Sequence, residues 1–481
     1  MSDPRNSSTY HTPNPSNPKI IIAGAGLGGL TLAILLEKAS IDYEILERAT
    51  TLKPLGSAIA LAPNVMPLLE QLGLMEELKG ISMECMGVGI HRDSSDGESL
   101  ELLSKTDISS LKGLSGYASI IMARPDLHAL LLSRVPSHKI HLGKRVLSIS
   151  QSNENGVLVR TSDGLTRECD ILVGSDGAYS GVRQSLYNLM KKEGCLPSSD
   201  GEDMKVCDMS VLGTTNSIDP SIVPLSKDGF SRSDTILGYK NSYSWRYFEV
   251  PGNRICWRVN VQLQSQSFVQ SDAFKNSEWG SESGGSIQED WRAFKLPLGP
   301  DNSYITIGDL INSTESDNVT KIMLEEKLYT TWHHDRTVLM GDAIKVEMQM
   351  LPNAGRGTVN AMLDAVILAN SLYEIAEDAT YSNIRSAFEE YYNERFPKAK
   401  ADLESSKRMA SLNSGQTWID DVMRKVMLNF MPSSMMKISF MKTLAYRPQA
   451  SFLPKIEYRG SGRVDPQKES KRYLHENVAA V

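Results

Sequence analysis

Three glycines and one acidic residue near the start of the chain carry the clearest chemical signal. Gly24, Gly26 and Gly29 form the pattern G-x-G-x-x-G, and Glu47 follows roughly 20 residues further on, the spacing this pattern requires. The first glycine permits a tight turn, the second lets the backbone approach a pyrophosphate, and the third lets a helix pack closely on a strand. A carboxylate in the position of Glu47 can accept hydrogen bonds from ribose hydroxyls. We therefore expect the ADP half of a dinucleotide to bind here.

The elements around these residues support that interpretation over the alternative of a purely structural glycine turn. Residues 20–23 are a short apolar run suited to a strand buried on both faces, and residues 43–46 form a second such run. A helix is expected from residue 27, and its N-terminal N–H groups and positive dipole end would face the phosphates. Arg124 follows a further apolar strand and precedes Pro125, which suits the first turn of a helix, so its side chain is placed to reach a phosphate or a ring.

Composition bounds the class of protein. The 481 residues exceed one typical domain, and the apolar share of 41% and charged share of 23% are typical of a soluble globular protein. The net charge of −7 does not indicate the basic surface that nucleic-acid-binding proteins usually carry. The five scattered cysteines and eight histidines show no metal-ligand spacing, so we expect reduced thiols and no metal. No apolar run is long enough to span a membrane, and we expect a cytoplasmic protein.

The chain divides by composition into a dinucleotide-binding body, an inserted sheet and a helical C-terminal region. Aromatic residues concentrate in strand-like pieces between residues 205 and 310, and we expect an antiparallel sheet there. The Met-rich stretch 423–441 is expected to pack on the core, with peripheral membrane contact as the alternative. The expected boundaries are a disordered leader over 1–18, a dinucleotide-binding domain over 19–78, 121–204 and 311–372, a substrate-binding sheet domain over 79–120 and 205–310, and a helical region with an extended tail over 373–481.

Two further segments join glycine to aspartate at the end of a strand-like run. Residues 170–183 contain Asp176-Gly177 and Arg183, and residues 341–343 are Gly-Asp-Ala, followed by Pro352, Gly355, Gly357 and Thr358. With the first motif, these segments resemble, in order, the FAD-dependent aromatic-hydroxylase type (group A) of flavoprotein monooxygenases, over roughly residues 19–372. The segment 446–454 is similar to the tail of fungal members. The resemblance implies an α/β fold with a Rossmann-like FAD-binding domain and the inserted sheet as substrate domain.

The same resemblance implies cofactor contacts. Asp342 would bind a ribityl hydroxyl of FAD, and Gly355, Gly357 and Thr358 would bring the backbone of a helix N-terminus to the pyrimidine edge of the flavin. Ala58 and Arg124 would also contact FAD. Asp176 and Arg183 are similar to residues linked to both FAD and NAD(P)H, with a structural turn and a surface arginine as the alternative.

The implied activity is a monooxygenase reaction. NAD(P)H, bound transiently, would reduce FAD, and O2 would then give a C4a-hydroperoxide that transfers one oxygen atom to an aromatic or polycyclic small molecule, by hydroxylation or epoxidation. The alternatives are a related reductase or halogenase, or a flavin-binding scaffold without turnover. The sequence indicates no catalytic base. The expected substrate wall lies on the inserted sheet, where about half of the candidates must face away; they are Tyr239, Tyr243, Trp245, Arg246 and Tyr247.

The third segment departs from the family pattern. Ile344-Lys345 stands where a histidine is usual, the loop before Pro352 is longer than usual, and Arg356 and Val359 replace common Gln and Asn. Substrate geometry is therefore the least predictable feature. Lys345, Glu347 and Arg356 are candidates for substrate contact, with solvated loop charges as the simpler interpretation.

Overall fold

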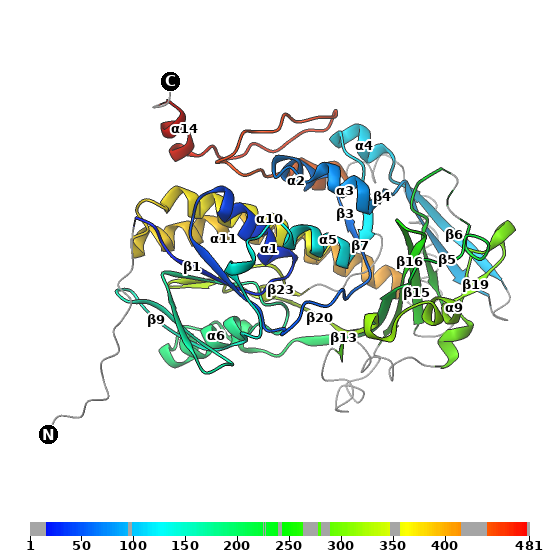
Figure 1. The fold of residues 1–481 in the computed structure, drawn as a ribbon, viewed down its shortest axis with the longest axis horizontal. Coiled ribbons are helices and arrows are strands. Elements are labelled where there is room, and N and C mark those ends of the chain that lie inside the picture. The colour runs from blue at the N-terminus through cyan, green and yellow to red at the C-terminus, as the bar shows by residue number, and fades with distance from the viewer. Residues whose placement is uncertain are drawn as a thin grey trace.

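The computed structural model describes residues 16–94, 99–224, 226, 228–238, 243–262, 278–279, 289–346, 356–414 and 440–478. Figure 1 shows a layered α/β body at one end of the molecule and a large sheet at the other. The expected α/β class, with an inserted sheet and a helical C-terminal region, is confirmed.

A six-stranded sheet forms the centre of the α/β body. Its strands are parallel except at the β21 edge, and β1 and β12 are buried along their whole length, as their apolar sequences require. The order along the sheet is β21 (His333–His334), β22 (Thr337–Leu339), β12 (Ile171–Gly174), β1 (Ile20–Ala23), β2 (Tyr43–Leu46) and β8 (Ile140–His141).

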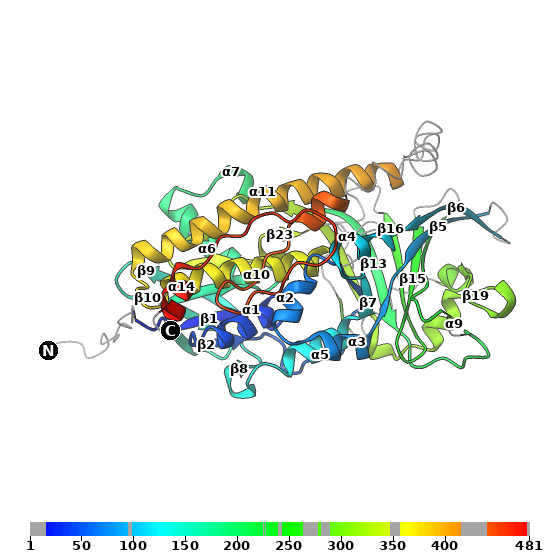
Figure 2. The same cartoon turned by 90° about the horizontal axis from the view of Figure 1, so that it is seen from above.

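Helices and a small sheet cover this central sheet. Helix α1 (Leu27–Lys38) is buried almost all round because α10 (Arg356–Ile375) packs against it, and α10 in turn packs against the long helix α11 (Tyr381–Ser414), as Figure 2 shows. Helix α6 (Gly181–Glu193) packs against β9. The remaining elements here are β9 (Val146–Ser152), β10 (Gly156–Thr161), β11 (Thr166–Cys169) and the short helix α7 (Ser198–Gly201).

The large sheet contains nine strands. Most neighbours are antiparallel, and β14 pairs with β5 in parallel. It extends beyond residue 310, where we expected the insert to end, because β20 pairs with β13 from Thr320 to Glu326. The strands are β17 (Glu278–Trp279), β20 (Thr320–Leu328), β13 (Lys205–Thr214), β16 (Arg254–Gln262), β15 (Tyr243–Val250), β14 (Ser233–Leu237), β5 (Gly87–Asp93) and β6 (Leu100–Asp107), with β23 (Lys345–Val346) paired to β20.

One face of the large sheet has its own hydrophobic core. Trp245, Trp257 and Trp291 are fully buried there beneath helix α9 (Ile307–Asn312) and the hairpin of β18 (Lys295–Leu296) and β19 (Ile305–Thr306). The other face meets the α/β body through a second cluster, in which Phe248 and Val250 pack with Ala123.

A three-stranded sheet connects the two bodies. Strand β7 (Ile120–Ala123) lies between β3 (Ala58–Leu61) and β4 (Ser82–Glu84), and β7 leads directly into α5 (Arg124–Leu132). Helices α2 (Met66–Gln71), α3 (Met75–Ile81) and α4 (Ser110–Ser115) complete this part.

The last described part of the chain runs back across the α/β body and ends in α14 (Lys471–Val478). The Gln71 side chain bonds the backbone of Ala450 in both directions, with Nε2 donating to the carbonyl at 2.9 Å and Oε1 accepting from the N–H at 2.8 Å. Most of the Met-rich stretch 423–441, and residues 1–15 of the expected leader, lie outside the described residues. Within the described ranges, no helix combines the length and apolarity needed to cross a membrane.

Candidate functional site

The glycine turn between β1 and α1 is close-packed on the protein side and open on the other. A Cβ built on Gly29 would lie 2.1 Å from the Gly24 carbonyl oxygen, and one on Gly24, whose φ is +106°, would lie 2.4 Å from that of Ser175. A Cβ on Gly26 would meet no heavy atom within 4 Å. Gly24 and Gly29 are therefore required by the fold, whereas Gly26 borders free space at the N-terminus of α1, as the predicted phosphate site requires.

Two side chains hold this turn against its neighbours. Glu47 accepts from the N–H groups of Ala25 and Ala49, each at 2.8 Å. His128 of α5 donates from Nε2 to the Ala25 carbonyl at 2.8 Å. Burial, and then the charge of Arg124, lower the pKa of His128, which keeps the ring neutral near pH 7. His128 carries no sequence motif, so sequence reasoning missed it.

Arg124 lies at the junction of β7 and α5, next to the predicted cofactor residue Ala58 on the paired strand β3. Its side chain passes beneath Gly56, where a Cβ would come within 2.7 Å of the arginine Cδ, and Nη1 donates to the Leu55 carbonyl at 3.0 Å. Burial lowers the pKa of Arg124, and the charge of Asp342 opposes that shift. Arg124 and Asp342, 218 positions apart by number, are thus close enough to interact electrostatically.

The third predicted segment meets the first at the start of α10. A Cβ on Gly28 would lie 3.0 Å from the Ala361 Cβ, and one on Gly341 would lie 3.2 Å from the same atom. Gly357 and Thr358 occupy the first turn of α10, whose N-terminus therefore lies beside the glycine turn. Gly355 lies outside the described residues.

A buried ion pair positions the strand end that carries Asp342. Asp364 of α10 accepts from the Gly341 N–H at 3.1 Å and from Arg395 Nε of α11 at 2.7 Å. The Arg395 and Asp364 side chains are 1% and 5% exposed. Arg395 also donates to the Asn360 side chain at 3.2 Å. Sequence reasoning missed Arg395, because nothing in the local sequence indicates that a residue on the next helix is a partner of Asp364.

The second predicted segment has a structural task in this structure. Both carboxylate oxygens of Asp176 are engaged at the N-terminus of α6, where Oδ2 accepts from the Gly181 N–H at 2.7 Å and Oδ1 accepts from the Ser180 hydroxyl. Arg183 is 4% exposed and donates to the Ala343 carbonyl at 2.8 Å, so the surface interpretation of this arginine is wrong. Arg183 connects the second segment to the third.

The solvated-loop interpretation is wrong for Lys345, which is buried, and Arg356 belongs to the first turn of α10 and not to a loop. Lys345 is 6% exposed, and its Nζ lies 3.9 Å from one carboxylate oxygen of Asp402 on α11. Arg356 Nη1 lies 3.8 Å from the other oxygen. Glu347 lies outside the described residues.

The expected substrate wall is divided by the pleat of β15. Tyr243, Trp245 and Tyr247 face the core beneath α9, where Trp245 stacks on Phe294 with 4.2 Å between ring centroids, so they do not face the α/β body. Arg246 shares the opposite face with Phe248 and Val250, which pack against the α/β body. Tyr239 lies outside the described residues.

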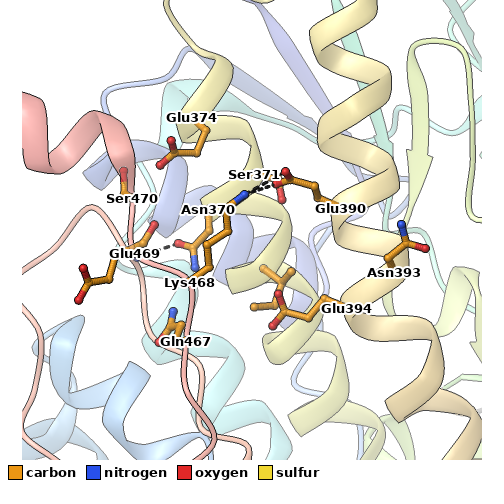
Figure 3. Close-up of a pocket in the computed structure, with 12 residues that line it drawn as sticks. Asn370, Ser371, Glu374, Glu390, Asn393, Glu394, Gln467, Lys468, Glu469 and Ser470 are labelled. Carbon is orange, nitrogen blue, oxygen red and sulfur yellow. Dashed lines mark hydrogen bonds and ion pairs between the residues drawn. The ribbon is translucent and has the colours of Figure 1, made fainter.

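Two other features lie away from this site. A cavity of about 320 Å³ opens between α10, α11 and residues 467–470 of the tail, and Figure 3 shows its carboxylates and the Lys468–Glu390 ion pair of 2.9 Å. Its α10 residues begin 11 positions beyond Arg356, or about 16 Å along the helix, so it is separate from the cofactor site. Glu193, Cys195 and His334 form a group at the surface that could hold a metal, with His334 already bonded to Glu193 at 2.8 Å.

The residues at the α1 turn fit a bound dinucleotide, and the fold and site together define a flavin-dependent oxidoreductase of the aromatic-hydroxylase type. A family profile described as an FAD binding domain matches residues 17–209 and 305–406. The chain belongs to this family and, by its curated relatives, to the FAD-dependent monooxygenases.

The relatives are fungal. The chain is 30% identical over 356 residues to the FAD-dependent monooxygenase nvfK of Aspergillus novofumigatus, covering 73% of this chain and 70% of the relative. It is 31% identical over 358 residues to the FAD-dependent monooxygenase andE of Emericella variicolor, covering 74% and 70%. The crystal structure of Klebsiella pneumoniae HpxO with FAD and uric acid shares the fold, with a TM-score of 0.67 and 20% identity over 90% of this chain and 97% of that chain.

Proposed function

We propose that this FAD-dependent monooxygenase uses NAD(P)H and O2 to insert one oxygen atom into an aromatic or polycyclic small molecule, by hydroxylation or epoxidation. The observation that carries the proposal is the convergence of three distant segments. The Gly24–Gly29 turn, the Arg124 junction and the strand end with Asp342 meet at the N-terminus of α10. Bound FAD would supply the redox and oxygen chemistry, and the chain would supply binding, orientation and exclusion of water.

The chain's own residues would divide this work. The N–H groups of the first turn of α1 would bind the pyrophosphate in the free space above Gly26. Glu47 would keep Ala25 in place and use remaining lone pairs of its carboxylate for ribose hydroxyls. Asp342 would bind the ribityl chain. The Asp364–Arg395 pair would fix the position of Asp342, because Asp364 accepts a hydrogen bond from the N–H of the preceding residue, Gly341.

The α10 N-terminus would favour negative charge on its ligand. Gly357 and Thr358 belong to its first turn, where N–H groups have no intrahelical acceptor. The cationic groups of Lys345 and Arg356 lie nearby, each within 4 Å of the Asp402 carboxylate. Both features would stabilise an anionic ring edge at this position.

The test is direct. The purified full-length protein is expected to be yellow, to oxidise NADH or NADPH, and to incorporate 18O from 18O2 into a member of a panel of phenols, indoles and prenylated polycycles. Asp342→Ala is expected to lose bound FAD, whereas the control Asp317→Ala, at a side chain that is 63% exposed, should retain it. A protein that binds FAD and never consumes a nicotinamide nucleotide would refute the proposed activity.

A further inference from the structure

A carboxylate, a thiol and an imidazole meet at the surface of the α/β body. Glu193 is the last residue of helix α6, and Cys195 follows it two positions later. His334 lies on the edge strand β21, and by number it is 139 positions from Cys195. One atom from each side chain, a carboxylate oxygen, the Sγ and a ring nitrogen, lies within 4.8 Å of the other two.

The way in which α6 ends brings two of these groups together. Gly194 has φ +73°, a left-handed conformation, and the Cys195 N–H donates to the Met190 carbonyl at 2.9 Å. These are the features of a Schellman ending, which folds the chain back over the last turn of the helix. As a result, the Cys195 Sγ lies 3.7 Å from Glu193 Oε2.

Strand β21 supplies the third group. Alternation along the strand directs His333 to the Phe388 ring on α11, with 5.8 Å between ring centroids, and directs His334 to the opposite face. There His334 Nε2 lies 2.8 Å from the same oxygen, Glu193 Oε2. The Gln151 side chain fixes the strand at this point by donating to the His334 carbonyl at 3.1 Å.

A further carboxylate lies beside His334. Asp335 Oδ2 is 3.7 Å from His334 Nε2, and Asp335 Oδ1 accepts from the Tyr381 hydroxyl at 2.6 Å. A tyrosine that binds one oxygen of a carboxylate orients the other oxygen, and metal ligands in proteins are commonly positioned by hydrogen bonds of this kind.

The distances between these atoms fit one small ion. Zinc takes four ligands in a tetrahedron at about 2.0–2.3 Å, which places neighbouring ligand atoms about 3.3–3.6 Å apart. The separations of 2.8, 3.7 and 3.7 Å lie on either side of that range. The side chains of Glu193, Asp335 and His334 are 52%, 24% and 23% exposed, so an ion can enter from solvent and the side chains have room to adjust.

The types of ligand favour zinc over the other common divalent ions. Magnesium and calcium prefer oxygen ligands, whereas a thiolate together with an imidazole suits zinc. Among the described cysteines, Cys195 is exposed, and Cys85, Cys169 and Cys256 are buried. The exposed cysteine is therefore the one that lies beside a histidine and a carboxylate.

We propose that Glu193, Cys195 and His334, with Asp335 as the fourth ligand, bind one Zn²⁺ ion. Binding releases the thiol proton of Cys195 to solvent and replaces the hydrogen bond between His334 and Glu193 with bonds to the ion. The ion then connects the end of α6 to the hairpin of β21 and β22, which stabilises this part of the fold.

The zinc site is structural and separate from the cofactor site. Helix α6 begins near the cofactor site, where Arg183 donates to the Ala343 carbonyl, and its 13 residues extend about 20 Å from there to Glu193. We expected no metal from the sequence because the cysteines and histidines show no local ligand spacing. The proposed ligands lie on two distant segments that only the fold brings together.

The experiment titrates zinc into the FAD-loaded full-length protein, with its thiols reduced, in competition with a chromophoric chelator. We expect one zinc ion per chain with a dissociation constant of about 1 μM or lower. At a zinc concentration 100 times that constant, the melting temperature should rise by about 2 °C or more.

Four variants locate the bound ion. Cys195→Ser and His334→Gln each remove a ligand and should weaken zinc binding at least about 100-fold, and Tyr381→Phe, which keeps all four ligands, should weaken it about tenfold. The control His138→Gln changes an exposed histidine outside this group and should leave the affinity unchanged. Binding that persists unchanged in both Cys195→Ser and His334→Gln would overturn the inference, as would a wild-type protein that binds no zinc.

Cobalt provides a second readout that identifies the sulfur ligand. Co²⁺ in the same site should give a thiolate-to-cobalt charge-transfer band in the difference spectrum against the cobalt-free holoenzyme, and Cys195→Ser should lose this band. A cobalt complex without the band in the wild type would contradict the proposed ligand set. Neither readout depends on turnover, so failure of the proposed monooxygenase activity would leave the zinc and cobalt results unchanged.

Discussion

Replacing Gly26 by Ala tests whether the space above the glycine turn belongs to the cofactor. The backbone at Gly26 has φ −75° and ψ 178°, which alanine adopts without strain, and an added Cβ meets nothing of the protein within 4 Å. A Gly→Ala change at such a position alters stability by no more than about 1 kcal/mol. A methyl group in the space of a pyrophosphate would nevertheless displace it, and we expect at least about a 100-fold loss of FAD affinity, or about 3 kcal/mol.

Gly29→Ala is the matched comparison, because its Cβ would lie 2.1 Å from the Gly24 carbonyl oxygen. Relieving that overlap requires the turn and α1 to move apart, at a cost of about 1–3 kcal/mol or more. The assay removes FAD, measures the melting temperature of each apoprotein, and then titrates FAD by fluorescence. Gly26→Ala should lose affinity alone, and Gly29→Ala should lose both stability and affinity. A folded Gly26→Ala protein with wild-type FAD affinity would refute this placement of the phosphates.

Three further changes test the supporting structure. Arg395→Met leaves the Asp364 carboxylate buried without its partner and should cost about 3–5 kcal/mol in urea unfolding, part of which Asp364→Asn in the same chain should restore. Burial lowers the pKa of His333 to about 4, so the unfolded chain binds more protons than the folded chain between about pH 6.5 and pH 4. The free energy of unfolding should therefore fall as the pH is lowered through that window, by at most about 3 kcal/mol. His333→Phe should flatten this pH dependence, and an unchanged slope in urea unfolding would contradict the assignment. Gln71→Ala removes both bonds to Ala450 and should cost about 1–3 kcal/mol, with faster hydrogen exchange near residue 450 as the check.

The dinucleotide-binding half of the fold could be predicted because its signals are local. The apolar run of β1, the three glycines and Glu47 lie within one strand–turn–helix–strand unit, and each has a meaning fixed by backbone geometry. The predicted contacts of these residues with FAD stay predictions, to be tested as above.

The orientation of β15 could not be predicted from its own sequence. Alternation shows that Trp245 and Arg246 point to opposite faces, but not which face meets the α/β body. That choice depends on Phe294, which stacks on Trp245 from a segment about 50 residues further along, and on Ala123 far upstream. An aromatic substrate wall was the natural expectation, and the aromatic side chains instead build the core of the sheet domain.

The same limit applies to charged residues whose partners are remote. Asp176 has the glycine context of a ligand-binding turn, yet its carboxylate caps the N-terminus of α6. The local sequence fits both a ligand-binding turn and a structural turn, so it could not decide between them. Lys345 lies in a segment that departs from the family pattern. Its burial beside Asp402 depends on where α11 packs, and the sequence around Lys345 does not determine that position.

The two faces of the large sheet differ in how their buried charges are paired. On the face beneath α9, Glu249 is fully buried and its carboxylate is paired with Arg232 at 3.0 Å, and Asp234 accepts from the Tyr247 hydroxyl. The sheet therefore pairs its buried charges where only protein surrounds them. On the face toward the α/β body, Arg246 is 8% exposed, and none of the described residues hydrogen-bonds to its Nε.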